Sequence, residues 1–260
     1  MKRILLKIIS FFVCLIVAFL MVQFVPADRS YPEEFRLPST RTDPSFLYSP
    51  SAWVDSVMQS LSLDEKIAQM LMVAAYSTSS KNNRKHEEET EKIIRNYNIG
   101  GLIFFQGTPV RQAQLTNRYQ KIAKTPLFIA MDAEWGLAMR LDSTIRYPRQ
   151  MMLGAIQNEK LIYDMGSQIA WQLKRLGVHI NFAPVADINN NAFNPVINSR
   201  SFGEDRANVT RKSILYMLGM QDNGIIAVAK HFPGHGDTEI DSHLDLPVIK
   251  HNRSRIDSIE

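Results

Sequence analysis

From about residue 62 onward, the hydrophobic and polar positions of the chain follow two alternating patterns. Short apolar runs predict β-strands over residues 71–75, 99–105, 126–132, 179–187 and 225–230. Between these runs, amphipathic segments predict helices, one after Ser62 and others over about 87–96, 112–124, 159–176 and 206–223. The last strand, which follows Gly224, is apolar on both faces and is expected to be buried. Strands that alternate with helices predict a parallel sheet of right-handed βαβ units.

Polar residues gather where the predicted strands end. Asp132 and Glu134 follow the third strand, Asp187 the fourth, and Lys230 and His231 the fifth. This one-sided pattern favours an α/β fold of the TIM-like (β/α)8 barrel class, with a site at the carboxyl ends of the strands. An open doubly wound sheet is the alternative, but no strand is followed by a G-x-G-x-x-G turn.

The number of strands bears on the domain organisation. A closed barrel needs eight βα units, and the sequence pattern supplies about five. We therefore expect residues 51–260 to form a barrel domain that is incomplete at its C-terminus.

The N-terminal segment predicts export. Lys2, Arg3 and Lys7 accompany an apolar run over residues 8–25, which is typical of a cleaved signal peptide over residues 1–27. The run is also long enough for a membrane anchor, which needs about 20 residues. Residues 28–50 are rich in proline and predict a linker. The one cysteine, Cys14, lies in the apolar run, so we expect a bacterial envelope or periplasmic enzyme without disulfides, which contacts the membrane only through an uncleaved N-terminal segment.

Composition and charge exclude one class of partner. The net charge of +4 is scattered, and no basic stripe is interleaved with aromatic residues, so we expect no nucleic-acid partner. The densest basic cluster, residues 81–85, continues into Glu87, Glu88 and Glu89 and predicts a solvated surface segment.

The loop Lys230–Pro247 carries the chemistry. Its glycines and proline over residues 233–236 forbid a regular helix, and it concentrates histidines and acids. Asp241 and His243 can form a pair in which the carboxylate fixes the imidazole tautomer and favours the protonated ring. Such a pair can donate a proton to a leaving group and later take one from water. The alternative is a hydrogen bond that only stabilises the loop.

A metal site is a second interpretation of the same loop. The candidate zinc or manganese ligands are His231, His235, Asp237, Asp241 and His243. Against a metal, the loop has no helical His-x-x-x-His face, and Lys230 would place a like charge beside the ion. We therefore expect neither a metal nor a cofactor.

The loop resembles the signature loop of glycoside hydrolase family 3, in its β-N-acetylglucosaminidase branch. Residues 131–140, 181–187 and 198–205 resemble segments of the same family, and the similarity covers about residue 53 to the end. The resemblance implies a TIM-like barrel and a terminal β-linked N-acetylglucosamine as the substrate, as in peptidoglycan or chitin-type fragments. It also implies that His243 is the acid/base and Asp241 its partner. The substrate contacts that it implies are Asp132, Arg140, Arg200, Lys230 and His231.

Some residues depart from the family pattern or carry it weakly. A retaining glycosidase needs a nucleophilic carboxylate, and the family's aspartate belongs to a later strand, so we expect it beyond residue 260, where an additional C-terminal domain could also follow. Trp135 stands where the family commonly has glycine, and it would either stack on a sugar or fill space. Asp187 is a weaker match with a structural alternative.

Several interpretations stay open at this point. Asp132 and Arg140 could form a salt bridge at the barrel rim, and Arg200 could brace its loop by pairing with Glu204 or Asp205. The family also allows a β-glucosidase, or an N-acetylglucosaminide phosphorylase, because a neutral imidazole repels phosphate less than a carboxylate does. A non-catalytic sugar-binding fragment is the alternative from another class.

Overall fold

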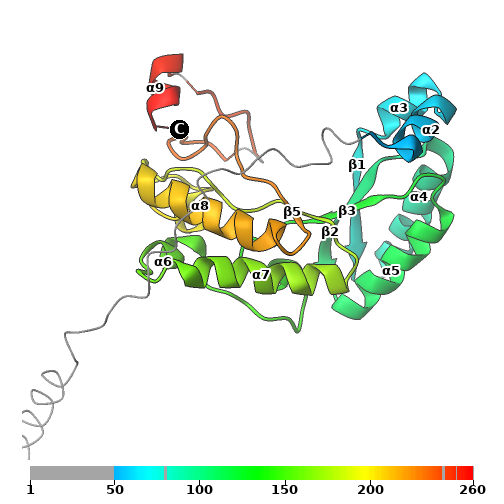
Figure 1. The fold of residues 1–260 in the computed structure, drawn as a ribbon, viewed down its shortest axis with the longest axis horizontal. Helices are drawn as coiled ribbons and strands as arrows, with labels where there is room; N and C mark the ends of the chain where they lie inside the picture. Colours follow the sequence, from blue (N-terminus) through cyan, green and yellow to red (C-terminus); the bar gives the residue numbers. More distant parts are fainter. Residues whose placement is uncertain (1–49, 79–80, 242–243, 250, 260) are drawn as a thin grey trace, which may run out of the picture. The chain divides into compact units, whose positions relative to one another are not determined.

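A computed structural model describes residues 50–78, 81–241, 244–249 and 251–259 (Figure 1). The predicted signal or anchor segment and all but the last residue of the predicted linker lie outside these ranges, so both remain predictions. Within the described ranges, none of the helices is both long and apolar enough to cross a membrane.

Five parallel strands form one sheet, in which each strand pairs with the next along the chain. The strands are β1 (Met72–Ser77), β2 (Gly101–Gly107), β3 (Phe128–Met131), β4 (Ile180–Asn181) and β5 (Ile226–Ala227). This sequential order confirms the predicted TIM-like α/β class, because a doubly wound sheet reverses its strand order. It also brings the carboxyl ends of β3, β4 and β5 together at one edge of the sheet.

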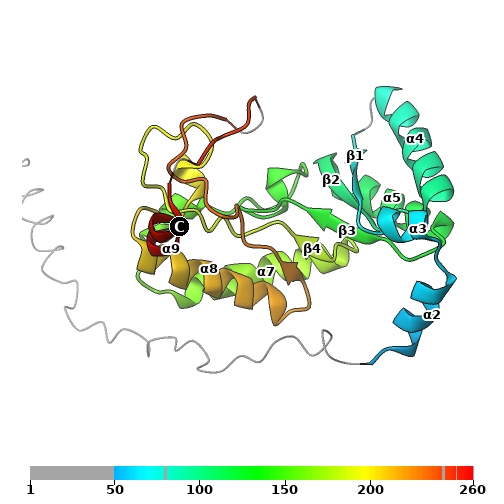
Figure 2. The same cartoon turned by 90° about the horizontal axis from the view of Figure 1, so that it is seen from above.

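The helices that the sequence predicts are present, one before β1 and the others between the strands. They are α3 (Leu63–Ala68), α4 (Lys81–Tyr97), α5 (Pro109–Ile122), α7 (Lys160–Arg175) and α8 (Arg206–Gln221). Figures 1 and 2 both show α7 and α8 lying side by side. Their close approach requires glycine, because a Cβ at Gly219 would lie 2.2 Å from the carbonyl oxygen of Tyr163.

Side-chain caps fix where several helices begin. Ser62 and Glu65 form a capping box at the start of α3, as expected from the acidic first turn. Thr108 caps α5 ahead of Pro109, and Asp205 caps α8 by accepting the backbone N–H of Asn208 at 2.7 Å. These caps satisfy amide groups that the first helical turn leaves without partners.

Three further helices were not predicted from the sequence: α2 (Ala52–Ser60), α6 (Gln150–Gly154) and α9 (Arg253–Ile259). Short 3-10 turns form at η2 (Leu137–Met139) and η3 (Asn198–Arg200). Helix α2 has no buried residue, so tertiary packing contributes little to it within the described part of the chain.

The prediction that residues 81–89 form a solvated segment is wrong at Glu87. Helix α4 begins at Lys81, six residues before the predicted start, and Glu87 is only 5% exposed. Its carboxylate contacts Arg111 and Arg118 of the neighbouring α5. The basic residues before Glu87 therefore belong to a helix whose inner face pairs a glutamate with two arginines.

The prediction that the fifth strand is buried on both faces is also wrong. Ile225 is 2% exposed, but Ile226 is 42% exposed. Strand β5 pairs with β4 and is the edge strand of the described sheet, so one of its flanks has no neighbour there to exclude water.

The buried core of the described residues lies between the sheet and its helices, where Phe104, Ile129 and Met131 of the strands and Ile169 and Leu173 of α7 have no exposed surface.

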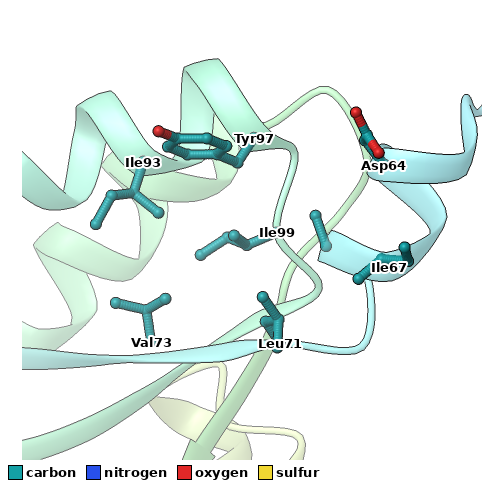
Figure 3. Close-up of a pocket in the computed structure, with 8 residues that line it drawn as sticks. Asp64, Ile67, Leu71, Val73, Ile93, Tyr97 and Ile99 are labelled. Carbon is teal, nitrogen blue, oxygen red and sulfur yellow. The ribbon is translucent and has the colours of Figure 1, made fainter.

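A pocket of about 440 Å³ lies beside the opposite edge strand, β1, and its lining is mainly apolar (Figure 3). Ile67 of α3, Val73 of β1 and Ile93 and Tyr97 of α4 surround it. None of the predicted site residues that the structure describes lines this pocket.

Candidate active site

The ends of β3 and β5 place oppositely charged side chains next to each other. Strand β3 ends at Met131, so Asp132 and Glu134 follow at the carboxyl end of the sheet. The path of β5 continues to Lys230, which bridges to Val185 and accepts the backbone N–H of Ala186 at 2.7 Å. Because the two parallel paths end at the same edge, Lys230 reaches the acids that follow β3.

Five side chains form what we call the charged network: Asp132, Glu134, Arg140, Arg200 and Lys230. Lys230 Nζ lies 2.8 Å from Oδ1 of Asp132 and 2.8 Å from Oε1 of Glu134. Arg140 Nη2 donates to Oδ2 of Asp132 at 2.7 Å. Arg200 donates through Nε and Nη2 to the two oxygens of Glu134, at 2.9 and 2.8 Å. The Glu134 side chain is 1% exposed, and the other four are 15–16% exposed.

Electrostatics keep the charged network ionised. Burial alone would raise the pKa of Asp132, but Lys230 and Arg140 outweigh it and hold that pKa below its ordinary value. Burial acts in the same direction on Glu134, and Arg200 and Lys230 hold its pKa below the ordinary value. Burial would lower the pKa of Arg200, but Glu134 raises it. Three cations and two anions leave the charged network with an excess of one positive charge.

An aromatic pair supports Arg140 from β1 and β2. The Arg140 guanidinium lies 4.8 Å from the centre of the Phe105 ring, and Phe105 stacks on Tyr76 with ring centres 5.6 Å apart. The stack restricts the orientation of the guanidinium while it donates to Asp132. Strands β1, β2, β3 and the path of β5 thus all contribute to one site.

His231 lies next to Lys230 and is held by a different acid. Its Nδ1 is 2.6 Å from Oδ2 of Asp187, and its side chain is 34% exposed. Asp187 also accepts the backbone N–H of His235 at 2.7 Å, while its own carbonyl accepts the hydroxyl of Ser201 at 2.6 Å. Asp187 therefore anchors the start of the loop that follows β5.

The predicted acid/base pair lies only partly within the described residues. Asp241 is described and partly exposed, whereas Ser242 and His243 lie outside the described ranges. The remaining loop residues have partners of their own, because His235 contacts Thr238 and Asp237 contacts His251. Within the described part of the chain, no three His, Cys, Asp or Glu side chains are arranged to hold a metal ion.

The structure brings together four predicted substrate contacts and corrects the alternative partner of Arg200. Asp132, Arg140, Arg200 and Lys230 all belong to the charged network, and the salt bridge between Asp132 and Arg140 is formed. Arg200 pairs with Glu134, so the interpretation that it braces its loop through Glu204 or Asp205 is wrong.

Glu134 is the member of the charged network that was predicted at a strand end but was not among the predicted substrate contacts. It lies inside the recognised segment 131–140 and follows a strand end, which was the available signal.

Trp135 is partly buried, and the Arg149 guanidinium lies 4.6 Å from its ring centre. One ring face therefore already carries a cation.

The sequential parallel strands and the polar site at their carboxyl ends define a TIM-barrel type of domain. Comparison with known proteins places it more narrowly. Residues 62–260 match the glycosyl hydrolase family 3 N terminal domain, and the chain belongs to that family.

The relatives include a β-hexosaminidase A from Pseudoalteromonas piscicida, 38% identical over 65% of this chain and 30% of the relative. A solved family 3 β-N-acetylglucosaminidase from Paenibacillus sp. str. FPU-7 is 37% identical, with a TM-score of 0.68 over 77% of this chain and 38% of that one. A β-glucoside phosphorylase is 26% identical, with a TM-score of 0.67 over 74% of this chain and 34% of that one. The chain thus spans about a third of the length of each of these proteins.

Proposed function

We propose that this protein is an exported, retaining exo-β-N-acetylglucosaminidase that releases terminal β-linked N-acetylglucosamine from peptidoglycan or chitin-type fragments. The observation that carries the proposal is the charged network at the carboxyl ends of β3 and β5, in a chain of family 3. The similarity to proteins named as β-hexosaminidase and β-N-acetylglucosaminidase supports this substrate class.

The charged network suits a ligand with many hydroxyl groups. Arg140, Arg200 and Lys230 supply charged donors, and Asp132 supplies acceptors at a partly exposed position. Charge-assisted hydrogen bonds are about twice as strong as neutral ones, and the opposed pairs hold each group in place before a sugar arrives. Such a site would bind an uncharged, polar sugar ring through its hydroxyl groups alone.

The proposed chemistry divides between two parts of the protein. The pair Asp241 and His243 would protonate the glycosidic oxygen and then activate water. A carboxylate of the same protein, expected beyond residue 260, would attack the anomeric carbon from the opposite face, as a retaining mechanism requires.

Binding by the charged network is tested with Lys230→Met in the complete protein. The variant removes two charge-assisted contacts, so KM for a β-linked N-acetylglucosamine disaccharide should rise at least about tenfold. Lys160→Met is the matched control, because Lys160 pairs with Asp164 on an exposed helix face, and its KM should stay at the wild-type value. An unchanged KM in the Lys230→Met enzyme would contradict the claim that the charged network binds the sugar.

Export is tested by cell fractionation. The proposal places the mature protein in the periplasm or cell envelope, on the basis of Lys2, Arg3, Lys7 and the apolar run that follows. An unprocessed protein confined to the cytoplasm contradicts it.

A phosphorylase is the second candidate, favoured by the similarity to a β-glucoside phosphorylase. Product analysis with and without inorganic phosphate separates the two reactions, because only a phosphorylase forms a sugar 1-phosphate. Sugar binding without turnover in either condition would indicate a non-catalytic module.

A further inference from the structure

The acid that holds His231 stands outside the charged network. The Asp187 side chain has no exposed surface, and Oδ2 lies 2.6 Å from Nδ1 of His231. The same carboxylate accepts the backbone N–H of His231 at 3.2 Å and that of His235 at 2.7 Å. The ring of His235 packs edge-on against that of His231, with centres 5.8 Å apart, and limits its rotation. Position and ring orientation of His231 are both constrained.

These contacts dictate which ring nitrogen carries the proton. An ionised carboxylate can only accept hydrogen bonds, so Nδ1 of His231 must be the donor to Asp187. A neutral imidazole has one N–H, which leaves a lone pair on Nε2. Among the described residues, Nε2 of His231 has no hydrogen-bond partner, and the side chain is 34% exposed. In its neutral form the ring therefore presents an acceptor to an incoming ligand.

We infer that Asp187 is a positioning residue, which fixes the neutral form of His231 as the Nδ1–H tautomer and so presents Nε2 as an acceptor for a substrate hydroxyl. This inference rests on the proposed function, because it assigns the ligand as a sugar. The cations near the pair are Lys230, which precedes His231 in the chain, and Arg200, whose pKa the charge of Asp187 helps to raise, and both only donate hydrogen bonds. A sugar hydroxyl donates as well as accepts. His231 supplies a further acceptor, beside those of Asp132, to complement the neighbouring donors.

The competing explanation is that Asp187 only braces the loop through the two backbone N–H groups. Asp187→Asn separates the two roles. An amide oxygen in the place of Oδ1 keeps the backbone contact with His235, whereas the amide NH2 in the place of Oδ2 donates to Nδ1. The His231 ring must then carry its proton on Nε2. A side chain of unchanged shape therefore presents a hydrogen-bond donor to the ligand at Nε2 in place of an acceptor.

The experiment combines a spectrum with an affinity. Long-range ¹H–¹⁵N spectra of ¹⁵N-histidine-labelled protein, recorded where the ring is neutral, should show His231 as the Nδ1–H tautomer. The signal is assigned by its loss in His231→Gln. In Asp187→Asn the tautomer should switch to Nε2–H, and the inhibition constant of N-acetylglucosamine should rise about tenfold, the effect of one lost hydrogen bond, with a smaller change in kcat.

A matched control tests loop bracing alone. Ser201→Ala removes the hydroxyl that donates to the Asp187 carbonyl and leaves the carboxylate in place. The tautomer and the inhibition constant should stay at their wild-type values. In the His231→Gln background, Asp187→Asn should weaken binding no further, because the two residues act through one hydrogen bond.

An Nε2–H tautomer in the wild-type protein would overturn the inference without any variant. So would wild-type affinity in Asp187→Asn, or a full additional loss in the His231→Gln background. Failure of the proposed function is distinct, because a protein that neither binds N-acetylglucosamine nor cleaves its β-glycosides would still show which tautomer Asp187 selects.

Discussion

Replacing Glu134 by glutamine should destabilise the protein more than the same change at another buried glutamate. The substitution keeps the shape of the side chain and removes its charge. Arg200 then loses its two hydrogen bonds to an ionised acceptor, and the excess charge of the network rises from one to two. Lys230 keeps its contact with Asp132.

The magnitude follows from burial. Breaking a buried ion pair by removing one partner costs about 3–5 kcal/mol, because an uncompensated charge stays buried. The arginine and lysine partners of Glu134 are each 16% exposed and cannot readily rehydrate. The amide oxygen still accepts one of the arginine N–H groups, so we expect a loss of about 3 kcal/mol, the lower end of this range.

Glu87→Gln is the matched control. Glu87 is also buried and also contacts two cations, but these arginines, Arg111 and Arg118, are 31% and 47% exposed. They can recover hydration, so the expected loss is about 1 kcal/mol. Urea denaturation of the wild type and both variants at pH 7 measures the difference. Equal losses in the two variants would refute the claim that burial of the cationic partners sets the cost.

Three further predictions concern pH, metal and the acid/base pair. The pKa values of Asp132 and Glu134 are held below their ordinary values in the folded protein. Their ion pairs therefore stabilise the fold above about pH 4, the pKa of such carboxyl groups in the unfolded chain, and this stabilisation is lost as the pH falls further. The gap in unfolding free energy between the wild type and Glu134→Gln should therefore shrink between pH 7 and pH 3; a constant gap would contradict this. The complete enzyme should keep its activity in EDTA. If EDTA abolished the activity and added zinc restored it, the interpretation of the loop histidines as metal ligands would be supported instead. His243→Ala should lose about 10²–10⁴ in rate on natural disaccharides, but much less in the first step on an activated aryl glycoside, whose leaving group barely needs a proton. Asp241→Asn should show the same pattern more mildly, and equal losses on both substrates would mean that His243 does not act as the acid.

The sequence predicted the strands and their order because each βα unit is local. Each apolar run and each amphipathic segment is recognised from its own periodicity, within a window of about 11–18 residues, and sequential parallel pairing follows from right-handed crossovers. Strand-end positions and the family resemblance then indicated Asp132, Arg140, Arg200 and Lys230, which lie together in the structure.

The pairing of Arg200 could not be predicted from spacing. Its partner, Glu134, is 66 residues away in the sequence, while the carboxylates of Glu204 and Asp205 are much closer to Arg200 along the chain. Only the alignment of β3 with the loop that follows β4 decides between them. The burial of Glu87 did leave a signal, since Glu87, Thr90 and Ile94 recur at helical spacing and all three are buried. This pattern was not used in the prediction, because the many charged residues over 81–89 indicated a solvated segment.

The sequential order of the strands has a consequence for how the protein folds and how long it stays folded. Neighbouring strands meet across short sequence separations, such as Met72 with Gly101, whereas Lys230 reaches Asp132 across 98 residues. The charged network can therefore form only after β3, β4 and β5 are aligned, late in folding. Interactions that form after the transition state slow unfolding without speeding folding. We expect the charged network to prolong the lifetime of the native state, so that Glu134→Gln unfolds faster while its folding rate stays close to that of the wild type.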